Sequence, residues 1–188
     1  MHAPKNTLIS VYDALHELAH FAYPQWLENA KILGEALGEM GIGGIARSGS
    51  PVSSAVLSSI ASVGGTSLLV SPAANEFEHA QAFRLPASAL PTIYSGRGAL
   101  GADVTALASS SAVLVVGEDE EALMGILGCA DGHGISIAIL CAGESADISR
   151  RLLMRYPSLE KFLLVSNDPN KIVKWVVESV RRKKYKNP

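Results

Sequence analysis

The chain has 188 residues, of which 48% are hydrophobic and 18% are charged. A chain of this size buries a large core without disulfides or a structural metal, and globular domains average roughly 100–200 residues. We therefore expect residues 1–188 to form a single domain, and the composition excludes disordered, collagen-like and disulfide-stapled classes. The two cysteines, Cys129 and Cys141, fall in an expected helix and an expected strand, as small buried hydrophobic residues do.

Charge is distributed unevenly along the chain. The net charge is −2, but five of the 16 basic residues lie in a basic tail at 181–188. The remaining body has 11 basic and 18 acidic residues, a net charge of −7 that repels phosphate backbones and argues against a nucleic-acid surface. We expect the tail to be a solvated helix end, with membrane or nucleic-acid contact as the alternative.

An uncharged stretch at 48–75 is long enough to be tested as a membrane span. Serines, the adjacent Gly64 and Gly65, and the flanking Pro51 and Pro72 interrupt it, so it forms no sustained apolar span. The N-terminal apolar run of about five residues is shorter than the roughly 7–15 of a signal-peptide core. These features predict a cytoplasmic protein with no membrane partner.

Strands and helices alternate along the chain. The expected elements are strand Thr7–Tyr12, helix Pro24–Met40, strand Ile42–Ala46, a helix from Pro51 to Gly64 and Gly65, strand Ser67–Ser71, strand Ala112–Val116, helix Glu120–Cys129, strand Ile135–Leu140, strand Phe162–Val165 and helix Asn170–Arg182. Several strands are apolar at consecutive positions, which is typical of a parallel sheet covered by helices on both faces. The predicted fold is therefore a doubly wound, Rossmann-like α/β domain, with an irregular stretch at 72–89.

Ligands of open parallel sheets bind beyond the carboxyl ends of the strands, where three loops stand out. The first loop is Arg47, Ser48, Gly49 and Ser50, directly before Pro51 at the expected start of a helix. Small residues permit close approach, free backbone N–H groups at a helix start attract anions, and Arg47 adds positive charge. These four residues are predicted to contact a phosphate. The alternative is that Ser50 only caps the helix.

The second loop contains Gly96, Arg97, Gly98 and Gly101. Their spacing spells G-x-G-x-x-G, but no clear strand of a first βαβ unit precedes it, so it is not the usual dinucleotide fingerprint. Accessible backbone and a guanidinium able to bind phosphate through two hydrogen bonds still predict a ligand contact. A flexible turn is the alternative interpretation.

The third loop begins at Gly117 and continues with four consecutive acidic residues at 118–121. Acids suit the positive end of a helix dipole, but they repel a phosphate. From this loop we expect only Gly117 at the ligand.

The segment His16-Glu17-Leu18-Ala19-His20 matches the H-E-x-x-H pattern of zinc proteases. A catalytic zinc needs a third protein ligand, and the extended pattern with a further glycine and histidine fails at Tyr23 and Trp26. Only one strand precedes the segment, so a built sheet does not support it. We expect no metal, with a zinc site at the two histidines as the alternative.

Several segments together resemble the Lonely Guy and lysine-decarboxylase-like family, and its molybdenum-cofactor-carrier members most. They are the Arg47–Pro51 loop, the following A-S-V-G-G-T-S-L-L-V, the S-A-V-L-V-V-G segment ending at Gly117, and the C-terminal L-L-V-S-N-D-P-N-K-I. The resemblance spans most of residues 7–182. It implies a Rossmann-type fold, a glycine-rich loop that binds phosphate, and a homodimer or higher homo-oligomer.

Family members that hydrolyse nucleoside 5′-monophosphates use a glutamate from G-G-x-G-T-x-x-E and an arginine from G-x-A-R-N. The first motif corresponds to Gly117–Gly125, where its glutamate falls on Met124 or Gly125. The second corresponds to Leu100–Asp103, where an alanine takes the place of the arginine. The resemblance therefore implies the fold without this hydrolase activity.

We expect a non-hydrolytic protein that binds a nucleotide or another phosphate-bearing small molecule, and the sequence names no resident cofactor. One alternative is a phosphoribohydrolase in which Glu120 or Glu121 replaces the usual glutamate and Arg97 the usual arginine. Another is a homodimer with a vestigial pocket, in which the serine-rich helix at Val52–Val63 packs against a partner.

Overall fold

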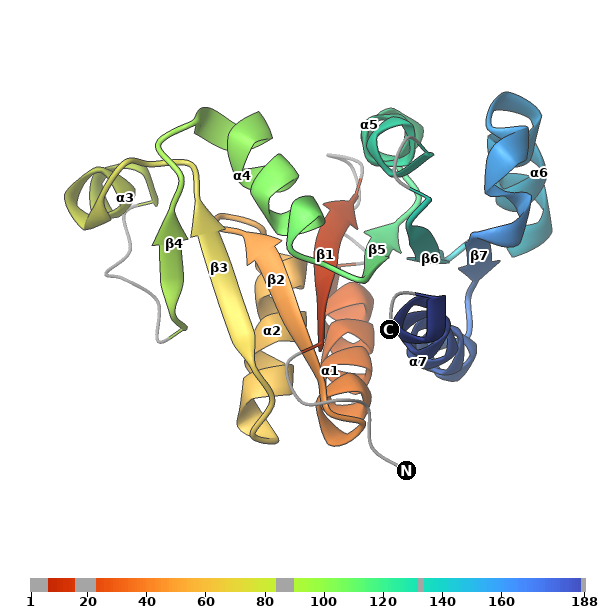
Figure 1. The fold of residues 1–188 in the computed structure, drawn as a ribbon, viewed down its shortest axis with the longest axis horizontal. Helices are drawn as coiled ribbons and strands as arrows, with labels where there is room; N and C mark the ends of the chain where they lie inside the picture. Colours follow the sequence, from red (N-terminus) through yellow and green to blue (C-terminus); the bar gives the residue numbers. More distant parts are fainter. Residues whose placement is uncertain (1–6, 16–22, 84–89, 132–133, 187–188) are drawn as a thin grey trace.

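The structure, a computed structural model, describes residues 7–15, 23–83, 90–131 and 134–186. One seven-stranded sheet, with strand order β4-β3-β2-β1-β5-β6-β7, runs through this part of the chain, and every neighbouring pair of strands is parallel. Figure 1 shows the strands in this order, from β4 at the left to β7 at the right. The predicted doubly wound, Rossmann-like α/β fold is confirmed.

The elements alternate strand and helix as the sequence predicts. The strands are β1 (Thr7–Ala14), β2 (Ile42–Arg47), β3 (Ser67–Ser71), β4 (Thr92–Tyr94), β5 (Ala112–Gly117), β6 (Ser136–Leu140) and β7 (Leu163–Ser166). The helices are α1 (Tyr23–Glu39), α2 (Pro51–Ser62), α3 (Glu76–Phe83), α4 (Gly98–Ala108), α5 (Glu120–Asp131), α6 (Ser145–Arg155) and α7 (Pro169–Lys186), with a 3₁₀ helix at Pro157–Lys161.

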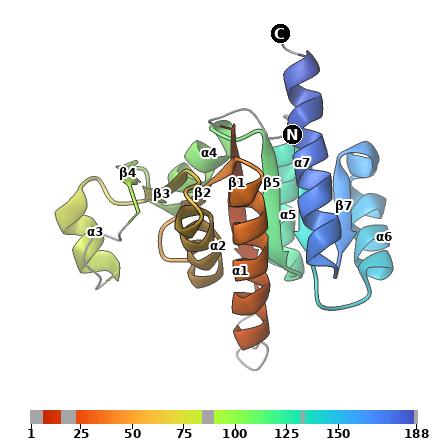
Figure 2. The same cartoon turned by 90° about the horizontal axis from the view of Figure 1, so that it is seen from below.

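Helices cover both faces of the sheet. Figures 1 and 2 show α1, α2 and α7 together on one face and α4, α5 and α6 on the other. Successive residues of β2 serve the two faces in turn, because Ile45 packs with Ala102 and Ala106 of α4 while Ala46 belongs to the core beneath α1 and α2. This two-sided burial explains why the strands are apolar at consecutive positions.

Five elements were not predicted: α3, β4, α4, α6 and the 3₁₀ helix. Helix α3 lies within the stretch predicted to be irregular, and a 2.9 Å hydrogen bond between His79 Nδ1 and Ser71 Oγ holds it beside β3. Helix α4 includes the second glycine loop and is stabilised by the packing of small alanines on β2 and β3 rather than by intrinsic helix propensity. Helix α6 buries only Ile148 and Leu152, so its apolar face is narrow.

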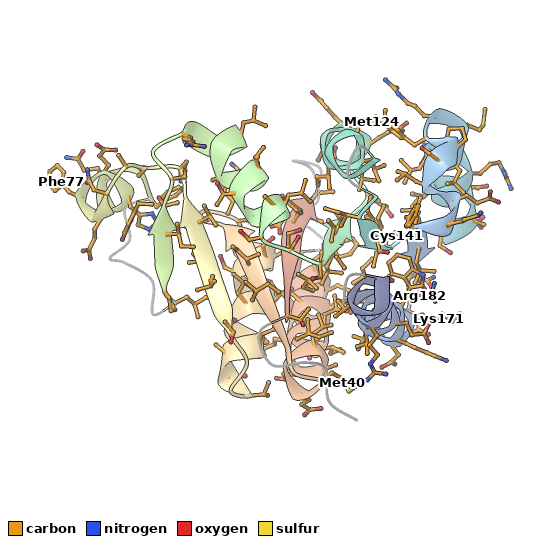
Figure 3. The ribbon with its side chains drawn as sticks, in the orientation of Figure 1. Met40, Phe77, Met124, Cys141, Lys171 and Arg182 are labelled. Atoms are coloured by element: carbon orange, nitrogen blue, oxygen red, sulfur yellow. The ribbon has the colours of Figure 1, made fainter. Side chains whose placement is uncertain are left out.

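Helix α2 packs its apolar face inside its own chain. Val56, Leu57 and Ile60 are fully buried in the core shared with α1. The alternative that α2 packs against a partner therefore stays a prediction that concerns only the face of the helix not used in this core. None of the helices described here has the length and apolarity needed to cross a membrane. Cys141 is buried at the end of β6, as expected (Figure 3).

The contact between α1 and α2 depends on a glycine at position 34. A Cβ at Gly34 would lie 2.4 Å from the Val56 carbonyl oxygen and 2.6 Å from the Ser59 Cβ, so any side chain forces the helices apart. Gly128 on α5 is a matched helical glycine, because the nearest atom to its Cβ position, the Tyr156 hydroxyl oxygen, is 3.7 Å away.

Gly34→Ala should lower the free energy of unfolding by about 1–3 kcal/mol, since it overpacks this helix contact. Gly128→Ala should raise it by about 0.4–1 kcal/mol, since it reduces the conformational freedom of the unfolded chain without a clash. Urea denaturation of both variants checks the prediction. Equal effects of the two substitutions would contradict the close α1–α2 contact.

Candidate ligand-binding site

The order in which strands are added to the sheet reverses at β1, because β2 to β4 follow on one side of it and β5 to β7 on the other. Ligands of doubly wound folds bind at such a switch point. A pocket of about 260 Å³ opens there, lined by residues of α4 and α5 and of the carboxyl ends of β1 and β2. Figure 1 shows α4 and α5 on either side of the end of β1. Ligand pockets are typically roughly 300–1,000 Å³, so this one has room for part of a ligand. Its lining comes from four elements: Tyr12 and Asp13 of β1, Arg47 of β2, Leu100, Asp103, Val104 and Leu107 of α4, and Ala122, Gly125 and Ile126 of α5.

The pocket combines apolar walls with charged groups contributed by the strands and by α4. Leu100 is 72% exposed and Val104 is 50% exposed, so two large apolar side chains of α4 are accessible to a ligand. Leu107 closes the pocket from the same helix and is buried. A few polar groups among apolar walls are typical of small-molecule sites.

Arg47 and Asp103 form an ion pair in the pocket. Arg47 Nε lies 3.1 Å from Asp103 Oδ1, and the two side chains are 42% and 30% exposed. Burial raises the pKa of Asp103 above its ordinary value, and the Arg47 charge opposes this rise. The Arg47 Nε–H is not aligned with the carboxylate, and Oδ1 accepts no hydrogen bond from the residues that the structure describes. The Tyr12 hydroxyl donates to the Asp103 carbonyl oxygen at 2.9 Å, which fixes this part of α4 to β1.

The start of α2 already holds an anion, the carboxylate of Asp13. The Val52 N–H donates to Asp13 Oδ2 at 3.2 Å and the Ser53 N–H donates to Oδ1 at 2.8 Å. The Ser53 hydroxyl donates to the same Oδ1. The backbone N–H groups that the sequence analysis expected to be free at this helix start are therefore occupied by a side chain of β1.

The rest of the first predicted loop is tightly packed. The Ser48 N–H donates to the Val70 carbonyl oxygen at 2.9 Å and so extends the pairing of β2 with β3. A Cβ at Gly49 would lie 2.5 Å from the Phe83 ring of α3. Ser50 stands at the N-cap of α2 without a side-chain capping bond. The Oγ atoms of Ser48 and Ser50 are buried and have no hydrogen-bond partner among the described residues.

The second predicted loop forms the start of α4 and borders the pocket. Gly98, with φ of +68°, is the first residue of the helix, and Arg97 is its N-cap without a side-chain capping bond. A Cβ at Gly101 would lie 2.2 Å from the Arg97 Cβ, so the stem of Arg97 runs beside Gly101. Helix α4 connects this loop to the Arg47–Asp103 ion pair, but Gly96, Arg97, Gly98 and Gly101 are not themselves lining residues of the pocket. Gly96 precedes the helix, with φ of +61°.

Among helices α2 to α7, the start of α4 is the one without an acidic side chain. Asp13 occupies the start of α2, and the first turns of α3, α5 and α6 all carry acids. Asp168 Oδ1 accepts from the Asn170 N–H at the start of α7. Arg97 gives α4 a positive charge instead. Helix dipole and side-chain charge therefore favour an anion at α4 and disfavour one at the other five starts.

The third loop is a structural junction between β1 and β5. A Cβ at Gly117 would lie 2.1 Å from the Ala14 carbonyl oxygen, and its φ of +117° also requires glycine. Asp119 Oδ1 accepts from the Ala122 N–H and caps α5, as the acidic run predicted. Glu118 Oε2 accepts from the Ala142 and Gly143 N–H groups after β6, so its carboxylate is engaged as well.

The alternative catalytic residues do not gather at the pocket. Glu120 pairs with Arg151 of α6 at 3.5 Å, and neither Glu120 nor Glu121 is among the lining residues. No group of three potential metal ligands occurs within the described ranges. The histidines of the H-E-x-x-H segment, His16 and His20, lie outside the described residues, so their possible zinc site stays a hypothesis.

Sequence reasoning missed Tyr12, Asp13 and Asp103. Asp13 carried a usable signal, because it is an acid directly after the apolar run of the first strand, at the edge where ligands bind. Asp103 carried none, since it lies in a helix that was not predicted.

The chain has the fold of molybdenum cofactor carrier proteins. It is similar to the Moco carrier protein of Chlamydomonas reinhardtii, with a TM-score of 0.69 and 17% identity over 95% of this chain and 99% of that chain. A second structure of the Chlamydomonas carrier gives a TM-score of 0.71 at 16% identity over 94% and 99% of the two chains. The molybdenum cofactor binding protein of the phototrophic bacterium Rippkaea orientalis gives 0.70 at 16% identity over 94% and 98%. No protein-family model and no curated protein matches the sequence.

Asp13→Ala should lower the free energy of unfolding by about 2–3 kcal/mol, because it removes a charged acceptor from two backbone N–H groups at the start of α2. Glu178→Ala is the control, since Glu178 makes an exposed ion pair with Arg182, and its loss should cost under about 0.5 kcal/mol. Guanidinium denaturation measures both. A loss for Asp13→Ala no larger than that of the control would show that α2 does not depend on this carboxylate.

Proposed function

We propose that this protein is a non-hydrolytic binding protein for a small phosphate-bearing ligand, either a nucleotide or the molybdenum cofactor. The observation that carries the proposal is the pocket at the strand switch point, where Arg47 is partly exposed and one wall is α4, the helix among α2 to α7 whose start lacks an acid. Such a site attracts an anion and offers apolar surface to the rest of the ligand.

The pocket suggests how the ligand is oriented. Leu100, Val104 and Ile126 offer an apolar surface to a ring system from α4 and α5. The phosphate is then bound by Arg47, with Arg97 and the N–H groups of the first turn of α4 as further donors, because nothing lies within 4 Å of a Cβ placed at Gly98. Ser48, Gly49, Ser50, Gly96, Gly101 and Gly117 do not line this pocket, so their contact with the ligand stays a prediction from the sequence alone.

The state of the nearby acids supports binding without hydrolysis. Asp13 is bound to the start of α2, and Asp103 is paired with Arg47. The hydrolase motifs that the family resemblance would require are also degenerate at Ala102 and at Met124 or Gly125.

The likeness to molybdenum cofactor carriers makes that cofactor, a phosphate-bearing pterin, the first ligand to test. This chain and the Chlamydomonas carrier match over nearly their whole lengths, so the similarity of fold is not limited to part of the sheet. We further propose membership of the carrier branch of the Lonely Guy-like family, a homodimeric or higher oligomeric state, and a cytoplasmic location.

A thermal-unfolding panel of the molybdenum cofactor, nucleoside mono-, di- and triphosphates and inorganic phosphate tests the proposal. A ligand present at 100 times its dissociation constant adds about 2.7 kcal/mol of stability. Arg47→Ala and Arg97→Ala should each weaken binding by about 10- to 100-fold, the loss expected for a charged hydrogen-bond donor. Arg182→Ala is the control, because Figure 3 shows Arg182 on α7, on the other face of the sheet.

Two results would overturn the proposal. If no member of the panel stabilises the protein, the pocket is not a phosphate-ligand site. If the protein releases the free base from any nucleoside monophosphate, it is a hydrolase with a rebuilt site rather than a carrier.

A further inference from the structure

The guanidinium proposed to bind the ligand phosphate has an anionic partner within the pocket. Arg47 Nε is 3.1 Å from Asp103 Oδ1, and both residues line the pocket. A phosphate that approaches Arg47 therefore meets a carboxylate on the same side chain. Two anions close to one guanidinium repel each other strongly where water is partly excluded.

The position of Asp103 is set by the fold. Its carbonyl oxygen accepts the hydrogen bond from the Tyr12 hydroxyl, and its neighbours Ala102 and Ala106 are fully buried against the sheet. The carboxylate is thus held by a fixed segment of α4 and does not leave the pocket by movement of a loose loop. Only a change of side-chain rotamer or of charge can free Arg47.

The charged and titratable groups that face Asp103 are few. Strand β1 contributes Tyr12 and Asp13, strand β2 contributes Arg47, and the residues of α5 that line the pocket are uncharged. Helix α4 carries no other ionisable residue between Gly98 and Ala108. Asp13 is bound by the start of α2, so Asp103 is the acid that competes for Arg47.

We propose that Asp103 is a built-in competitor that decides which anions reach Arg47, and that anionic ligands bind with displacement and protonation of this carboxylate. The inference rests on the proposed function, because it concerns the same pocket. Asp103 is a specificity-determining residue in this account. It excludes weakly binding anions at neutral pH and admits a ligand that also gains contacts from α4 and α5.

The direction of the pH effect follows from the charges. Burial raises the pKa of Asp103, so protonation is accessible at a pH above the ordinary Asp value of 3.8. An anion beside the carboxylate raises that pKa further, so binding takes up a proton. Affinity for an anion of constant charge must therefore increase as the pH falls, until Asp103 is protonated in the empty protein as well.

Sulfate is the probe for the test, since its charge does not change between pH 8 and pH 5, with inorganic phosphate as a second anion. Binding is measured by titration calorimetry to the wild type, Asp103→Asn and Asp147→Asn. Asp147 is an exposed acid on α6 that pairs with Arg150, so its variant removes the same charge outside the pocket. At pH 8, Asp103→Asn should bind sulfate about three- to tenfold more tightly than either of the other two proteins. Its affinity should be nearly independent of pH, while that of the wild type rises towards pH 5.

Two results would overturn the inference, and a third would overturn the proposed function on which it rests. Equal affinities of Asp103→Asn and Asp147→Asn, with a pH-independent wild type, would overturn it while leaving the proposed function intact. If Asp103→Asn does not fold, calorimetry of the wild type in two buffers of different ionisation enthalpy gives the number of protons taken up, and an uptake of zero overturns the inference. If the wild type and Asp103→Asn bind neither these anions nor any ligand of the panel, the proposed function itself fails.

Discussion

The site depends on the hydrogen bonds that the Asp13 carboxylate accepts from the backbone N–H groups at the start of α2. The carboxylate joins the end of β1 to a helix that packs behind β2, and it supplies internally the anion that this helix start attracts. Acids also lie at the starts of α3, α5, α6 and α7, and at α5 and α7 an aspartate accepts a hydrogen bond from a backbone N–H group. Among α2 to α7, α4 is the helix with a basic residue and no acid at its start, and it also lines the pocket. This is why we propose that an anionic ligand binds there.

Arg47 connects this electrostatic arrangement with ligand chemistry. It extends from the last position of β2 towards α4, where it meets Asp103 and the apolar side chains of the pocket. In the ion pair each charge compensates the other. In our proposal, the pair also sets how strongly an incoming anion must bind to displace Asp103. The carriers of similar structure share only 16–17% of their residues with this chain. The fold is therefore common to these proteins, whereas the account of this site depends on residues of this chain.

The sequence predicted the parts of the fold whose burial leaves a clear pattern. Strands such as Ala112–Gly117 are buried on both faces, and their consecutive apolar residues indicated a parallel sheet. Helix α4 left no such pattern, because its packing uses alanines and its first turn contains two glycines. Arg47 and the second glycine loop were correctly expected at one sheet edge, since strand ends define that edge. Asp13 could have been expected at that edge from its place after the first apolar run, but its partner at the start of α2 and the position of Asp103 depend on which elements meet in space.

Crystallography with selenate at pH 5, where Asp103 competes least for Arg47, tests the central claim most directly, because the anomalous signal of selenium locates a bound anion without reference to any ligand hypothesis. The account predicts a selenium peak in the pocket between α4 and α5, beside Arg47 and the first turn of α4. A peak at the start of α2, with the Asp13 carboxylate displaced from the Val52 and Ser53 N–H groups, would contradict it.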